Sequence, residues 1–99
     1  MVQRRSPRRE RQQRELGENI RRWRIVNGMS AAELADRAAV TRDTLRAIES
    51  ATGAPRLDSF LAILTALGIA DTVIAATDPY RSDAARARID EILRRGGTL

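Results

Sequence analysis

The sequence predicts an all-α fold, with a compact bundle of about five short helices, a further C-terminal helix and a disordered, basic N-terminal arm. Apolar residues recur at helical spacing over most of the 99 residues. Serine or threonine precedes several of these stretches and glycine follows them, as is usual at helix ends. The first 14 residues lack the apolar periodicity. We therefore expect an arm over residues 1–14, a helical domain over residues 15–69 and a helical extension over residues 70–99.

Arginine dominates the predicted arm, which also contains Pro7. The formal net charge of the chain is +5, and nine Arg and three Glu precede residue 25, whereas nine Arg and ten acidic residues follow. The positive excess therefore lies in the arm and the first helix. Such an arm can follow DNA phosphates or enter a minor groove, or it can be a solvated tail without a partner. Its assigned arginines are Arg4, Arg5, Arg8 and Arg9, and part of residues 8–14 would alternatively extend the first helix.

The first helix is expected over residues 15–27, and Gly28 would supply the left-handed residue at its end. One face would carry Leu16, Ile20 and Trp23, together with Arg24. An unpaired charge on an inward face is expensive, so Arg24 needs a partner. Ile25 and Val26 fall off this face and should be exposed, either as ordinary surface residues or as a contact surface.

Residues 30–49 predict two short helices joined by a tight turn. Ser30 and Thr41 can cap them, because a hydroxyl there accepts a hydrogen bond from a backbone N–H of the first turn. The inward residues are Leu34, Ala35 and Ala38 in the first helix, and Val40, Leu45 and Ile48 around the second. The outward side of the second helix carries Arg42, Asp43, Arg46 and Ala47, so it is polar and has no bulky apolar residue.

Residues 50–56 predict a loop, and residues 57–67 predict a strongly apolar helix that Gly68 ends. Its expected core stripe, which is not a cofactor site, is Leu57, Phe60, Leu61, Leu64 and Leu67. A short helix over residues 71–76 should follow, and Pro79 breaks it.

The last helix is expected to start after Ser82 and to reach Arg95, with ion pairs Asp90–Arg94 and Glu91–Arg95. Its apolar side is narrow, consisting of Ala85, Ile89, Ile92 and Leu93. Such a stripe needs a covering partner, either the body of the same chain or a second copy. We expect a homodimer formed by the residues after 69.

Composition argues against an enzyme. The chain has no Cys and no His, which excludes disulfides and thiolate metal sites and removes the usual general base. The acidic residues are scattered, and no nucleophile stands beside a base. We expect no catalytic residue, no metal and no cofactor. The sequence has no apolar run of membrane-spanning length and no signal-peptide pattern, so a cytoplasmic protein is expected.

A series of short motifs carries a family resemblance. In order, they are Leu16-Gly17-Glu18 with Ile20, Arg21 and Arg24, then Gly28-Met29-Ser30, Glu33-Leu34-Ala35, Val40-Thr41-Arg42, Ile48-Glu49 and the segment from Pro55 to Gly68. This series resembles the helix-turn-helix domain of Cro and the phage repressors, the XRE family, over residues 15–69. The resemblance implies a lambda-repressor-like bundle in which residues 42–50 form the recognition helix. It also implies that Arg24 pairs with Glu49, the alternative being two independent exposed charges.

The resemblance implies DNA base contacts by Arg42, Asp43, Arg46 and Ala47. Arg42 can bond the O6 and N7 atoms of a guanine, and Ala47 is small enough to meet a thymine methyl group. Asp43 would accept from a cytosine amine, or would instead stabilise the helix N-terminus.

DNA backbone contacts are implied for Ser30, Ala31, Thr41, Thr44, Thr52, Gly53 and Arg56. The family has Gln where this chain has Ala31, so backbone N–H groups would have to hold that phosphate. Ala39 stands where glycine is common, so a left-handed turn there would cost about 1 kcal/mol.

The function implied is that of a sequence-specific regulator, a repressor, that binds double-stranded DNA as a homodimer on a palindromic site. The alternative is the antitoxin of a toxin–antitoxin pair, which binds a protein partner and regulates its own operon. The surface considered for such a partner comprises Ile25, Val26, Tyr80, Ile89, Ile92 and Leu93.

Overall fold

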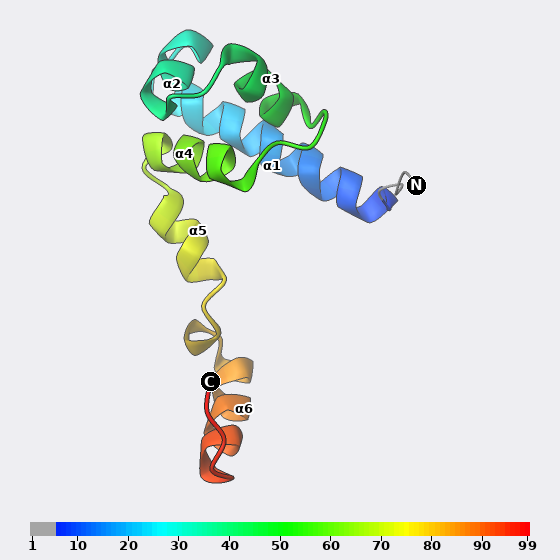
Figure 1. Cartoon of the computed structure of the whole chain (residues 1–99), viewed down its shortest axis with the longest axis vertical. Helices are drawn as coiled ribbons and strands as arrows, with labels where there is room; N and C mark the ends of the chain where they lie inside the picture. Colours follow the sequence, from blue (N-terminus) through cyan, green and yellow to red (C-terminus); the bar gives the residue numbers. More distant parts are fainter. Residues whose placement is uncertain (1–5) are drawn as a thin grey trace. The chain divides into compact units, whose positions relative to one another are not determined.

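The computed structural model describes residues 6–99, and every regular element among them is helical (Figure 1). The all-α prediction is therefore confirmed. The helices are α1 (Pro7–Val26), α2 (Ala31–Ala38), α3 (Arg42–Ser50), α4 (Leu57–Leu67), α5 (Ala70–Ala76) and α6 (Asp83–Arg94), with a 3₁₀ turn over Pro79–Arg81. The chain divides after Ile69 into a first compact unit and a second one, Ala70–Leu99.

Helix α1 begins eight residues earlier than expected, so the prediction of a disordered arm is wrong for residues 7–14, and the alternative, an extension of the first helix over residues 8–14, is correct. The hydroxyl of Ser6 accepts a hydrogen bond from the backbone N–H of Arg9 at 3.1 Å, and Pro7 occupies the first turn, where proline favours a helix. The Arg, Glu and Gln residues that follow are good helix formers. Arg8 and Arg9 therefore lie on a helix, whereas Arg4 and Arg5 lie outside the described residues.

The face of α1 that packs on the bundle differs from the predicted one. Ile20 is buried as expected, but Leu16 and Trp23 are 51% and 43% exposed. The second buried residue of the helix is Gly17. The helix is thus rotated so that the line through Gly17, Ile20 and Arg24 faces its neighbours, with the two large apolar residues on the flank.

The core of the first unit lies between two pairs of helices. Helix α1 packs against α3 and α2 packs against α4 (Figure 1). The largest fully buried side chains come from three helices and are Leu34, Leu45 and Ile63. The predicted stripe of α4 is partly wrong, since Leu57 and Leu61 are exposed and Ile63, which that stripe omits, is fully buried.

The second unit contains α5, the 3₁₀ turn and α6. The carboxylate of Asp78 caps the turn by accepting from the N–H of Tyr80 at 3.0 Å. Ile89 is the one residue of this unit in the buried core, at 5% exposure. Glu91 pairs with both Arg94 and Arg95, so Arg94 turns to Glu91 and not to Asp90, the partner predicted for it.

Among residues 6–99 no single helix is both long and apolar enough to cross a membrane, although α4 and α5 counted together would pass that test.

Candidate nucleic-acid interface

Helices α2 and α3 have the two caps that the sequence predicts. The hydroxyl of Ser30 accepts from the N–H of Glu33 at 3.1 Å, and the Glu33 carboxylate accepts in return from the N–H of Ser30. The hydroxyl of Thr41 accepts from the N–H of Thr44 at 3.0 Å. Between the helices Ala39 is left-handed, with φ 54° and ψ 40°. This turn fixes the direction in which α3 leaves α2.

The inward side of α3 is anchored by packing and by an ion pair. Leu45 and Ile48 are buried. Arg24 of α1 donates from Nε to Oε2 of Glu49 at 2.8 Å and from Nη2 to Oε1 at 3.0 Å. A third N–H of Arg24 bonds the carbonyl of Met29 at 3.2 Å. With 15% and 12% of the two side chains exposed, the pair is largely shielded from water.

The hydrogen bonds to Glu49 raise the pKa of the Arg24 guanidinium, against the opposing effect of desolvation. Because the folded-state pKa is the higher one, the resulting stability is present in full below the ordinary arginine pKa and is lost only as the pH rises through the folded-state value. Arg24 is therefore charged near neutral pH and adds no pH dependence there.

A close backbone contact, which sequence reasoning missed, sets the distance between α1 and α3. A Cβ atom added to Gly17 would lie 2.5 Å from the carbonyl oxygen of Ile48 and 2.7 Å from that of Glu49. Only glycine fits between these atoms. The available signal was an isolated glycine inside a helical pattern, which often indicates close packing.

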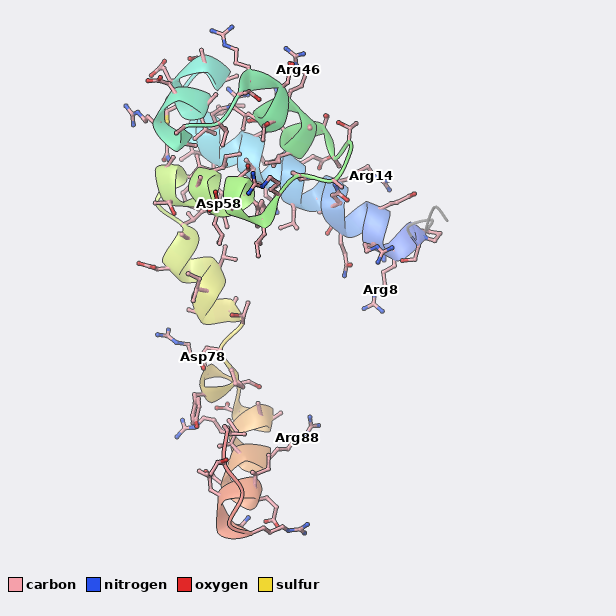
Figure 2. All side chains as sticks on the ribbon, in the orientation of Figure 1. Arg8, Arg14, Arg46, Asp58, Asp78 and Arg88 are labelled. Carbon is pink, nitrogen blue, oxygen red and sulfur yellow. The ribbon has the colours of Figure 1, made fainter. Side chains whose placement is uncertain are left out.

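The outward side of α3 carries the residues predicted to read bases. Arg42, Asp43 and Arg46 are exposed and Ala47 is half-buried. Asp43 pairs with Arg46 at 3.5 Å, one turn along the helix. Figure 2 shows Arg46 pointing away from the bundle. This side of α3 is thus an open polar ridge.

Two hollows flank the ridge. The first, which we call the α1–α3 hollow, measures about 430 Å³ and is lined by Arg21, Ala31, Ala32, Arg42, Leu45, Arg46, Glu49 and Ser50. The second, the loop hollow, measures about 370 Å³ and is lined by Asp43, Thr44, Ala47, Thr52, Gly53, Ala54, Pro55, Arg56 and Ser59. Of the predicted backbone contacts, Ala31 thus lies at the first hollow, and Thr44, Thr52, Gly53 and Arg56 gather at the second. The hydroxyls of Ser30 and Thr41 are occupied as helix caps.

The residues considered for a protein partner are not all on the surface. Ile25 and Val26 of α1 are 54% and 75% exposed, and in the second unit Tyr80, Ile92 and Leu93 are also exposed. Ile89 is buried within the second unit, so it does not belong to an exposed surface there.

The sequence model of a family described as a helix-turn-helix domain matches residues 15–77, more than half of the chain. The chain belongs to this family. No curated protein and no solved structure matches the chain significantly. A helix-turn-helix domain is that of a DNA-binding regulator. Within the matched range, α2, the turn at Ala39 and α3 form two short helices joined by a tight turn. The first eight residues of α1 and all of α6 lie outside the matched range.

Proposed function

We propose that this helix-turn-helix protein is a sequence-specific transcription regulator, a repressor of the Cro and phage-repressor type, that inserts α3 into the DNA major groove. The observation that carries the proposal is the two-sided character of α3. Its inner residues are buried and tied to α1 through Glu49, whereas Arg42, Asp43 and Arg46 face solvent. A helix held in this way can enter a groove without distorting the fold, and the major groove is wide enough to admit it.

Base recognition is assigned to the exposed ridge. The Arg42 guanidinium can donate two hydrogen bonds to a guanine, which is worth about 1–3 kcal/mol of discrimination. Ala47 offers a small apolar surface to a thymine methyl group. The Asp43 carboxylate has two possible partners. It can accept a hydrogen bond from a cytosine amine, and it pairs with Arg46 in the free protein.

We assign the two hollows, which flank the ridge, to the two sugar-phosphate strands that border a major groove. In the loop hollow, Thr44, Thr52 and Arg56 offer donors to one strand. In the α1–α3 hollow, the start of α2 offers backbone N–H groups to the other strand at Ala31, where the side chain itself has no polar atom. These contacts would set the position of the protein while α3 reads the sequence.

A homodimer is part of the proposal, and the composition of the second unit supports it. Units of fewer than about 40 residues rarely fold alone without disulfides, metals or association. The second unit spans Ala70–Leu99, has no cysteine and buries Ile89, while Ile92 and Leu93 remain exposed. Pairing of two such units would cover these residues. A dimer would carry two α3 helices, and paired helix-turn-helix units generally bind half-sites roughly 34 Å apart.

An antitoxin role is the second candidate. It is favoured by the adjacent exposed residues Ile25 and Val26, which lie on α1 away from the core, and by the exposed Tyr80. Exposed apolar residues such as the pair Ile25 and Val26 suit a protein partner such as a toxin. Co-purification of a second chain with the protein from its native host would favour this role over that of a free-standing repressor.

The test is selection of bound sites from a pool of random DNA by the intact protein, followed by footprinting of the selected site. We expect a palindromic sequence with two protected half-sites. Absence of any protected site at low salt would overturn the proposal.

A further inference from the structure

We propose that Arg14 and Arg21 of α1 bind phosphates of the DNA strand that lies beside the α1–α3 hollow, so that the interface continues along α1 beyond the helix-turn-helix unit. This inference rests on the proposed function, because it assumes that α3 lies in the groove.

The starting observation is a cluster of arginines at the α1–α3 hollow. Arg21 from α1 lines it together with Arg42 and Arg46 from α3. The acidic group at its wall, Glu49, is neutralised by Arg24. Within residues 6–99 the guanidinium groups of Arg21 and Arg42 have no hydrogen-bond or ion-pair partner. The hollow therefore combines free cationic groups from two helices, a combination suited to a phosphate.

Arg14 extends this cationic surface along α1. It precedes Arg21 by seven residues, which is two helical turns, so the two side chains leave the helix in nearly the same direction and about 10 Å apart. Arg14 is exposed, and within residues 6–99 its guanidinium also lacks a polar partner. At this spacing the two arginines would reach different phosphates. Figure 1 shows the N-terminal turns of α1 extending past the ends of α3 and α4, and Figure 2 labels Arg8 and Arg14 on this half of the helix.

Because α1 is one continuous helix, it holds Arg14 and Arg21 at fixed places relative to α3. The same helix is fixed to α3 at Gly17 and at Arg24, on either side of Arg21. Arg14 lies one turn before Gly17, so its place relative to α3 is set by regular helix geometry. A disordered arm would have to lose conformational entropy to make the same contact, whereas this helix already has its form.

The neighbouring Arg22 provides a matched control. One residue turns a helix by about 100°, so Arg22 points away from the bundle on the side opposite Ile20. Its guanidinium lies 3.7 Å from Glu18, and its side chain is 67% exposed. Replacing Arg21 or Arg22 by Gln removes the same charge from the same helix, so net charge alone cannot distinguish the two variants.

The experiment measures binding of the intact protein and of the Arg14→Gln, Arg21→Gln and Arg22→Gln variants to duplexes of random sequence over a series of salt concentrations. We expect Arg14→Gln and Arg21→Gln each to weaken binding about tenfold at low salt. The slope of log K against log salt should fall by about one unit for each protomer bound. Arg22→Gln should change neither quantity. Circular dichroism should be the same for all variants.

The possible results separate this inference from the proposed function. Arg56→Ala, which removes a cation from the loop hollow, is measured in the same series as a reference for phosphate contact. If the Arg14 and Arg21 variants bind like the Arg22 variant while Arg56→Ala weakens binding, the α1 contact is overturned and the DNA-binding proposal stands. If all arginine variants lose the same affinity, the effect is one of net charge and the assigned contacts are overturned. If the unaltered protein binds no duplex at low salt, both proposals fail.

Discussion

Arg24 donates hydrogen bonds to both carboxylate oxygens of Glu49 and thereby joins the last turn of α3 to the C-terminal half of α1. The third bond, to the carbonyl of Met29, connects the same guanidinium to the segment that precedes α2. One side chain thus connects α1, the last turn of α3 and the segment before α2. We assign the pair a structural role, since both side chains are largely shielded from water and the outer side of α3 remains exposed.

Removal of Arg24 should be costly for stability. The Arg24→Met variant leaves the Glu49 carboxylate largely buried without its partner, and we expect the free energy of unfolding to fall by about 3–5 kcal/mol in urea denaturation. The control is Arg22→Met, which breaks an exposed pair and should cost less than about 1 kcal/mol. Equal losses in the two variants would show that burial of the Arg24–Glu49 pair has no energetic weight.

Replacement of Gly17 by alanine should destabilise the domain, although Gly→Ala inside a helix usually stabilises by about 1 kcal/mol. The added methyl group would meet the carbonyl oxygens of Ile48 and Glu49, and we expect a loss of about 1–3 kcal/mol. Gln12→Ala on the exposed part of α1 serves as the control and should be close to neutral. A stabilised Gly17→Ala protein would contradict the close contact between α1 and α3.

In contrast to Gly17→Ala, the Ala39→Gly substitution should increase the free energy of unfolding. Ala39 has a left-handed backbone, which L-residues adopt at a cost of about 1–2 kcal/mol and glycine adopts freely. After allowing for the greater flexibility of glycine in the unfolded chain, we expect a gain of about 0.5–1 kcal/mol in thermal or urea unfolding. In contrast, Ala66→Gly inside α4 should lose about 1 kcal/mol. A loss at residue 39 as large as that at residue 66 would rule out the strain argument.

Much of this fold could be predicted from local sequence, because capping groups and helical periodicity are properties of neighbouring residues. The starts of α2 and α3 follow from Ser30 and Thr41, and the end of α4 follows from Gly68. The early start of α1 is also determined by local sequence, but Pro7 is compatible with two structures. It breaks a helix from within and favours one in the first turn, and the cap at Ser6 decides between them.

Burial was harder to predict than secondary structure, because it depends on which neighbour each helix meets. Leu16 and Trp23 look like core residues by hydrophobicity, but Gly17 allows α3 to approach so closely that the helix presents its glycine side. In α4 the fully buried residue is Ile63, whereas Leu57 is exposed. At the candidate interface, the residues of each hollow come from separate segments, and Arg21 is grouped with Arg42 only by the packing of α1 on α3.

Once a bound site has been selected, substitutions of the base-contacting Arg42 and of the phosphate-contacting Arg56 should affect DNA binding differently. We expect Arg42→Ala to cost about 1–3 kcal/mol of binding free energy and to relax the preference at one base pair. Arg56→Ala should weaken binding to all sequences alike and reduce the salt slope by about one unit. Gel-shift titrations on the selected and on random duplexes measure both. Identical behaviour of the two variants on the two kinds of duplex would refute the division of roles.

The second unit should control assembly. Replacing both Ile92 and Leu93 by Glu adds charge to its exposed apolar residues, and we expect the variant to sediment as a monomer where the unaltered protein sediments as a dimer. Replacing the neighbouring Asp90 and Arg94 by Ala provides the control, which should remain dimeric. If the full-length protein itself sediments as a monomer, as does a chain ending at residue 69, the homodimer proposal is wrong.

The contact at Gly17 also bears on how such a protein can change its target. Main-chain atoms, which are common to all residues, set the spacing between α1 and α3. Exchange of the outward side chains at positions 42, 43, 46 and 47 therefore leaves that spacing intact. On the proposed function, new operator preferences would arise by substitution on one helical face, without compensating changes elsewhere in the domain.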